Sequence, residues 1–221
     1  MSSVPGPSSD RVQVRRLPKR ACYDRAVLHA ILDEALVCHV GFDLEGQPYV
    51  IPTIYARVGD TLYVHGSAAS RMLRTLREGV PVCVTVTLVD GLVLARSAFH
   101  HSMNYRSAVV LGRAVEVSDP REKEAALRAI VEHVVPGRAA EVRAPNPKEM
   151  AATLVLRLPL EEASAKIRSG GPLDDEEDYG IRCWAGQIPL RTVPQAPIAD
   201  GRVPDGVAPS GAVLGYRRPG W

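Results

Sequence analysis

The sequence lacks several features that would place it in a large protein class. Aromatic residues make up only 5% of its 221 residues, so we expect a core built mainly of valine, leucine, isoleucine and alanine. No apolar run is long enough to span a bilayer, and the N-terminus has no apolar stretch of the kind found in secretory signals. The four cysteines are scattered and form no CxxC pair, which argues against a zinc site and indicates reduced thiols in a cytoplasmic protein.

A strong excess of one charge is also absent. The 27 lysines and arginines are offset by 25 aspartates and glutamates, and the net charge of +2 is too small to indicate a nucleic-acid partner. Neither GxxxxGK nor GxGxxG occurs, so the usual nucleotide-binding fingerprints are excluded. The hydrophobic fraction of 46% is nevertheless sufficient for the core of one domain.

What the sequence does contain is a succession of alternating apolar and polar residues. This period of two predicts strands in the stretches 36–56, 60–66, 80–89, 107–118 and 153–160. Helices are expected after Asp24 and Asp119, each of which can act as an N-cap. Because the strands follow one another without βαβ spacing, we expect a mostly β protein, a largely antiparallel barrel with flanking helices.

The two ends of the chain differ in composition from the middle. Residues 1–20 mix serine, proline and basic residues, and we expect a flexible N-terminal arm. Residues 187–221 form a proline-rich C-terminal tail that we expect not to continue a sheet, and to be either extended over a surface or disordered. Residues 21–186 remain as the folded domain.

The segment 63–79 passes from a predicted strand to a predicted helix through small residues. Arg71 falls in the first helical turn, where the helix dipole disfavours a cation. A phosphate would explain this arginine, because free N–H groups and the hydroxyls of Ser67 and Ser70 could bind its oxygens. The alternative is that one of these serines is simply an N-cap and that the arginines of the helix form a solvated face.

Three stretches resemble, in the same order, the pyridoxamine 5′-phosphate oxidase-like superfamily of FMN-binding proteins. They are VIPTIYARVGDTLYVHGSAASRMLRTL, SAFHHSMNYRSAVVLGRAVEV and EEASAKIRSGGPLDDEEDYGIRCWAG. Within the superfamily, the sequence is most similar to nitroimidazole-reductase (Nim-type) and flavin-nucleotide-binding proteins. The resemblance spans about residues 15–190 and implies a six-stranded antiparallel Greek-key split barrel. It also implies a homodimer with FMN at the subunit interface.

The resemblance further implies which residues contact FMN. The backbone of one strand would line the isoalloxazine ring, at positions Val50, Ile51, Pro52, Thr53, Ile54 and Tyr55. His65 and Gly66 would lie beside the flavin, and Ser70 and Arg71 would hold its phosphate. Ser107 would reach the cofactor, from the partner chain, and Trp184 falls near a tryptophan that the oxidases place over FMN.

The sequence departs from the oxidases at one phosphate-binding position. Met72 stands where they have a lysine, so either Lys166 or Arg106 is the candidate to replace that cation. The residues that bind pyridoxal phosphate in the true oxidases have no match, so oxidation of vitamin B6 is not expected.

The resemblance therefore favours an FMN-dependent oxidoreductase that reduces small nitro-aromatic or quinone-like compounds. His65 would be its catalytic residue, because a histidine with an ordinary pKa near 6.5 can donate a proton at neutral pH; a purely structural strand histidine is the alternative. Two other functions stay open: a non-catalytic flavin-binding protein, and a haem-binding relative with His100 or His101 as iron ligand. Because these adjacent histidines would face opposite sides of a strand, they cannot share one metal ion, and no metal site is expected.

Overall fold

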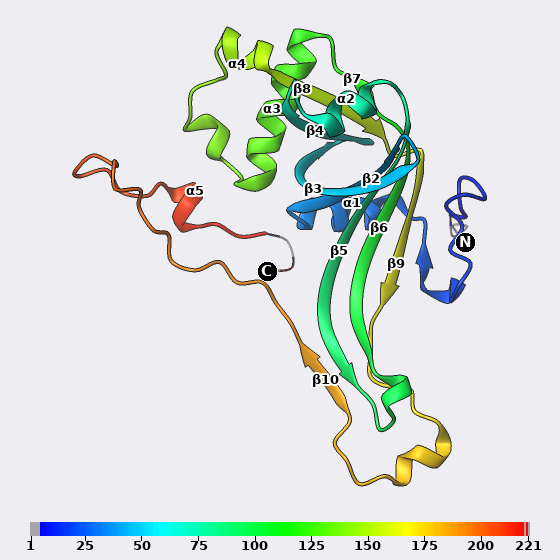
Figure 1. Cartoon of the computed structure of the whole chain (residues 1–221). Helices are drawn as coiled ribbons and strands as arrows, with labels where there is room; N and C mark the ends of the chain where they lie inside the picture. The colour runs from blue at the N-terminus through cyan, green and yellow to red at the C-terminus, as the bar shows by residue number, and fades with distance from the viewer. Residues whose placement is uncertain (1–4, 219, 221) are drawn as a thin grey trace.

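A computed structural model describes residues 5–218 and residue 220 of the chain (Figure 1). These residues form one sheet with the strands β1 (Ala21–Cys22), β2 (Val37–Leu44), β3 (Gln47–Val58), β4 (Thr61–Ser67), β5 (Pro81–Leu94), β6 (Ser102–Arg113), β7 (Val115–Glu116), β8 (Thr153–Pro159), β9 (Glu162–Arg168) and β10 (Gly186–Pro189). The helices are α1 (Arg25–Glu34), α2 (Arg71–Arg77), α3 (Pro120–Val134), α4 (Pro147–Ala152) and α5 (Gly211–Leu214).

The strands are arranged in the order β1-β9-β6-β5-β2-β3-β4-β8-β7, and β10 pairs with β5. Every pairing is antiparallel. The mostly β, antiparallel class expected from the sequence is therefore confirmed. The described residues form ten strands where six were expected, and three of these strands, β1, β7 and β10, have only two to four residues.

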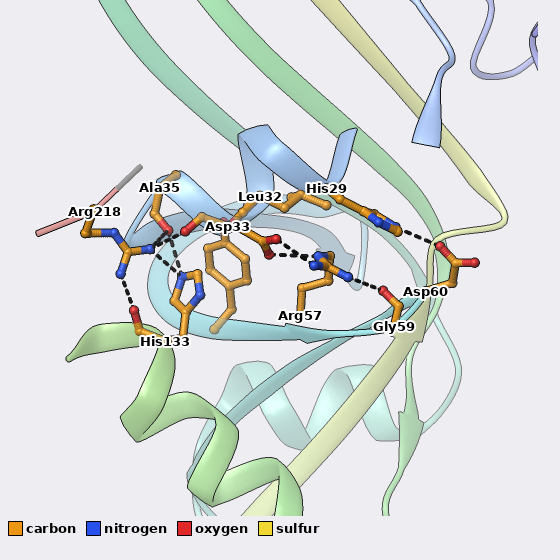
Figure 2. Close-up of polar contacts among 10 residues, drawn as sticks. His29, Leu32, Asp33, Ala35, Arg57, Gly59, Asp60, His133 and Arg218 are labelled. Carbon is orange, nitrogen blue, oxygen red and sulfur yellow. Dashed lines mark hydrogen bonds and ion pairs between the residues drawn. The ribbon is translucent and has the colours of Figure 1, made fainter. Parts of the chain in front are cut away.

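The alternation of apolar residues places one face of the sheet against a core that α1 closes. Val82, Val84 and Val86 of β5 point into this core, as their spacing predicts, and are at most 4% exposed. Leu28 and Ile31 of α1 pack into the same cluster. The helix is also tied to β3 through Arg57, which binds both carboxylate oxygens of Asp33 at 2.8 and 2.6 Å (Figure 2).

The helix starts follow the capping residues that the sequence predicts. The Asp24 carboxylate accepts a hydrogen bond from the backbone N–H of Val27 at 3.1 Å. The Asp119 carboxylate accepts hydrogen bonds from the N–H groups of Arg121 and Glu122 at the start of α3. Each cap satisfies amide groups that the first turn of a helix leaves without a partner.

Strand β8 departs from the simple alternation because both of its faces are covered. Leu154, Leu156 and Leu158 enter the main core, as expected. Val155 points the other way, is 0% exposed, and packs with Ala126 of α3 in a second cluster. Helix α3 therefore lies on the outer side of the sheet, next to β4 and β8.

Both ends of the chain make specific contacts with the sheet. The described part of the N-terminal segment, which we expected to be flexible, contacts β9. Arg11 pairs with Glu162 at 2.9 Å, and Val12 is 4% exposed. The expectation that the C-terminal tail cannot continue a sheet is wrong, because Gly186–Pro189 forms β10 and pairs with residues 91–94 of β5. Beyond β10 the tail runs extended and returns toward α1 (Figure 1).

The hairpin of β5 and β6 extends well past the rest of the sheet (Figure 1). We call this extension, with β10 and the segment 169–185 that leads to it, the arm. Large apolar side chains are exposed on the arm, among them Phe99 at 90% and Trp184 at 66%. Isolated exposed apolar residues are common, whereas a gathered set is typical of an interaction surface.

Candidate functional site

Strand β3 divides its six predicted cofactor residues between two faces of the sheet. Val50, Pro52 and Ile54 are exposed on the outer face, opposite the core. Tyr55 points inward and is fully buried, and its hydroxyl donates a hydrogen bond to the backbone oxygen of Leu32. Burial raises the pKa of Tyr55, so its side chain belongs to the core. Ile51 and Thr53 alternate with the exposed residues and are half-buried.

The strand register brings the other predicted polar residues onto the same outer face. Ser107 on β6 lies opposite Lys166 on β9, and its hydroxyl donates to the Lys166 carbonyl at 3.2 Å. Thr87 on β5 lies opposite Ser107. His39 on β2 lies between Pro52 and Thr85, again with its side chain outward. This surface therefore joins residues that are distant in the sequence. His39 and Lys166, for example, are 127 positions apart.

His65 lies beside the end of this outer face, on β4. Its cross-strand partner on β8 is Val155, and Ile54 of β3 is next to it because Tyr55 pairs with Val64. The side chain of His65 points away from the buried Leu62 and Val64, as the alternation predicts.

The imidazole of His65 forms part of the wall of a cavity of about 620 Å³. The other walls come from Ile54, from α3, and from the segment 138–153, which includes the 3₁₀ turn η3 (Arg138–Ala140) and α4. Nδ1 of His65 is buried and has no hydrogen-bond partner among the described residues. A buried polar atom without a protein partner is unusual in a folded protein, and an ordered water or another bound group can complete its bonding.

Burial lowers the pKa of His65 below its ordinary value. The role of His65 as a proton donor stays a prediction, and a lowered pKa leaves less of the protonated imidazole at neutral pH than the ordinary value would. The neutral imidazole dominates at neutral pH, and neutral imidazole is the form that binds metal ions.

The cavity combines an apolar stripe of α3 with charged side chains, among them Glu124 and Arg128 of α3 and Glu149 of α4. Leu127, Ile130, Val131 and Val134 recur at helical spacing along the face of α3 that lines it. Three arginines also line it: Arg138 pairs with Glu141 and Arg143 with Glu149, while Arg128 forms no ion pair with any described residue. The sequence did not predict that α3 forms a wall of this cavity. A signal was present, because α3 has more apolar residues than the buried Ala126 and Ile130 alone.

The predicted anion site lies at the start of α2. Ser70 is the N-cap, and its hydroxyl oxygen accepts from the N–H of Leu73 at 3.5 Å, as the alternative interpretation expects. Its O–H stays available as a donor. Arg71 is exposed, forms no ion pair with the residues described, and stacks over the ring of Tyr49 at 4.3 Å. Gly66 precedes this turn, where a side chain would approach Leu73 at 3.1 Å.

Of the residues considered for the missing lysine, one is already committed elsewhere. Met72 is 6% exposed and belongs to the core. Arg106 binds Glu34 at 2.8 Å and Asp90 at 2.6 Å, so it is not free to hold a phosphate. Lys166 forms no ion pair within the described part of the chain and lies on the outer face.

The remaining predicted residues do not gather at this face within one chain. Trp184 immediately precedes β10 and covers Gly186. Strand β10 lies at the end of the molecule opposite α2 (Figure 1). His100 contacts the Asp175 carboxylate at 3.0 Å, and His101 contacts the backbone oxygen of Ser97 at 2.9 Å. Neither histidine lines the His65 cavity.

Residues 24–167 match the family model described as pyridoxamine 5′-phosphate oxidase. The chain belongs to this family. Members share the split-barrel architecture, and the match covers the whole outer face and His65. No protein in a search of curated proteins matches the chain. No helix in the described part of this family member is long and apolar enough to cross a membrane.

Solved structures extend the family relationship over the full chain. The flavocytochrome Anf3 from Azotobacter vinelandii is 42% identical, with a TM-score of 0.91, over 97% of this chain and 100% of that one. The FAD and haem binding protein from Mycobacterium smegmatis is 38% identical, with a TM-score of 0.86, over 90% and 98%. A 5-nitroimidazole antibiotic resistance protein from Bacteroides thetaiotaomicron is 28% identical, with a TM-score of 0.57, over 66% and 86%.

Proposed function

We propose that the protein is a flavin-binding oxidoreductase that reduces small nitro-aromatic or quinone-like compounds. The observation that carries this proposal is the outer face itself. There the strand register gathers the exposed β3 residues, Ser107 and Lys166 into one surface. Membership of the family and the flavin named for two full-length relatives support it.

The residues present fit a phosphorylated flavin. Arg71 has no carboxylate partner among the described residues, and the hydroxyls of Ser67 and Ser70 can donate beside it. Lys166 offers a second cation, on the outer face of the sheet, whereas Arg71 lies over Tyr49 of β3. When bound, the flavin supplies hydride and electron transfer; the chain binds it, orients it along the β3 backbone and limits its contact with water. FMN and FAD both carry the phosphate that these groups would recognise.

We further propose that two copies of the chain assemble around the cofactor. The outer face is exposed in a single copy, with Val50 at 68%. The apolar residues of the arm are exposed in the same way. A second copy would cover both surfaces. It would also bring to the cofactor those predicted residues, such as Trp184, that lie far from the outer face of their own chain.

Mass spectrometry of the small molecules released on denaturation tests the flavin directly. We expect FMN or FAD in the purified protein, bleaching of its absorption with NADH or NADPH, and recovery of that absorption on adding nitro-aromatics or quinones. Flavin that never turns over with any acceptor would leave only the binding function. The absence of any bound flavin, and of binding when flavin is added, would overturn the proposal. Light scattering that gives the mass of one chain would overturn the assembly.

A second function, haem binding, is favoured by a specific observation. His65 forms part of the wall of a largely apolar cavity of about 620 Å³, and burial lowers the pKa of its imidazole, which favours the neutral form that can bind iron. Arg128 lines the same cavity and could bind a propionate. Two full-length relatives are described by names that include haem or cytochrome. We therefore propose His65, rather than His100 or His101, as the iron ligand; the haem, when bound, supplies one-electron chemistry.

Titration of the protein with haemin, followed by its Soret absorption, tests this second function. We expect a saturable shift in the wild type that His65→Ala abolishes. His39→Ala is the matched control, because His39 is an exposed strand histidine outside the cavity. An unchanged spectrum in His65→Ala, or a change that follows His100→Ala, would overturn the assignment. Retention of flavin by His65→Ala shows that the variant is folded.

A further inference from the structure

The C-terminal tail carries a buried arginine close to its end. Arg218 is 5% exposed, although it lies in a tail whose other residues are largely exposed. Its guanidinium donates to the backbone oxygens of Asp33 at 2.6 Å and Ala35 at 3.2 Å, and to that of His133 (Figure 2). It also donates to the backbone oxygen of Glu34 at 2.8 Å. No carboxylate in the described structure pairs with it.

These four oxygens belong to the ends of two helices. Asp33 and Glu34 are the last residues of α1, Ala35 is its C-cap, and His133 is in the last turn of α3. The final carbonyls of a helix have no partner within the helix, and the dipole makes them attractive to a cation. A planar guanidinium with five donors can bind several of them at once, which an ammonium group cannot do in the same geometry.

His133 makes a second link between the same two helices. Its Nε2 is 2.7 Å from the backbone oxygen of Ala35, so Nε2 carries the proton and donates. Its ring packs against Tyr55 at a centroid distance of 4.8 Å, and the Tyr55 hydroxyl binds Leu32 of α1. Arg218 therefore completes a junction that holds the end of α3 against α1 and the core.

The end of α3 is also a wall of the His65 cavity. Val134 and Val135 follow His133 directly, and both line that cavity. Val135 lines a second cavity of about 390 Å³ as well, whose other walls are tail residues 194–197, 213, 214, 216 and 217. The tail thus lies behind the wall that His65 faces, and Arg218 joins the tail to it.

We propose that Arg218 is a positioning residue, which fixes the end of α3 and so sets the shape and affinity of the His65 cavity. No described tail residue lines this cavity; the docked tail acts on it only by holding the wall that the end of α3 forms. The identity of the ligand, haem, rests on the proposed function; the positioning itself does not.

The test compares Arg218→Ala with Arg217→Ala in the full-length protein. Arg217 is the adjacent arginine and is exposed, so its substitution leaves the junction intact. We expect faster amide hydrogen exchange at residues 130–135 in Arg218→Ala alone. We also expect haem affinity to fall by about 10- to 100-fold, the range for residues that orient a ligand through another group. Flavin content should not change.

Arg218→Lys and added guanidinium ion separate positioning from general loss of stability. Lysine keeps the positive charge but lacks the planar guanidinium, so amide hydrogen exchange in Arg218→Lys should be intermediate. Millimolar guanidinium should restore slow amide exchange and haem affinity to Arg218→Ala. Unchanged exchange at residues 130–135 in Arg218→Ala would overturn the proposal. A wild type that binds no haem, with exchange altered as expected, would instead overturn the haem function and leave the positioning role standing.

Discussion

Arg71→Ala tests whether the start of α2 binds the flavin phosphate. A charge-assisted hydrogen bond is worth about 1.5–3 kcal/mol. In the unliganded chain, Arg71 already stacks over Tyr49 at 4.3 Å, and an exposed cation–π contact contributes about 0.5–1 kcal/mol that is lost if the guanidinium turns to the phosphate. The net loss in the variant is then about 1–2 kcal/mol, which is about five- to thirtyfold in affinity.

The assay is fluorescence titration of the apoprotein with FMN, FAD and riboflavin. Only the first two carry phosphate, so Arg71→Ala should weaken them and leave riboflavin unchanged. Arg74→Ala is the matched control, because Arg74 is exposed on the same helix one turn further along and has no ion pair in the described structure. Equal losses for all three ligands, or the same loss in Arg74→Ala, would mean that Arg71 is only a solvated surface residue.

Three further predictions concern stability. Burial lowers the pKa of His133, so on acidification the unfolded chain binds a proton at this residue at a higher pH than the folded chain does. The free energy of unfolding should therefore fall as the pH drops from about 6.5 toward the lowered pKa. In His133→Gln this fall should be smaller. Arg106→Leu leaves the Glu34 carboxylate, 8% exposed, without its partner and should cost about 3 kcal/mol in urea denaturation; a loss below about 1 kcal/mol contradicts this. Leu156→Ala should cost about 2–5 kcal/mol and Val58→Ala, at an exposed site, less than about 0.5 kcal/mol; equal losses would contradict the core assignment.

The parts of the fold that sequence predicts well are those that neighbouring residues determine. The alternation of Val82, Val84 and Val86 records which face of β5 is buried, because successive side chains of a strand point to opposite sides. Asp24 and Asp119 mark helix starts because a cap acts on amides only two or three residues away. The anion site could be proposed for the same reason, since Ser70 and Arg71 are adjacent.

The parts that sequence did not predict depend on contacts between distant residues. The alternation in β8 predicts that Val155 faces solvent, yet α3 covers it. The residues around Val155 carry no information about which helix packs there. The His65 cavity needs the same docking of α3. Arg218 reads as one more basic residue of an exposed tail, and its burial follows only from where α1 and α3 both end. The strand β10 formed despite Pro189 because it lies at an edge, where proline is tolerated.

The scarcity of aromatic residues bears on how the outer face is covered. The chain has two phenylalanines and two tryptophans, and Phe99 and Trp184 are left 90% and 66% exposed on the arm. Burying one large apolar side chain contributes about 1.5–3 kcal/mol, so a chain with few such groups would gain from burying them in an assembly. The arm is built on β5 and β6, and these strands also carry Thr87 and Ser107 of the outer face. A copy that covers the arm would therefore lie next to the cofactor residues, and we infer that the subunit interface and the flavin site are parts of one continuous surface.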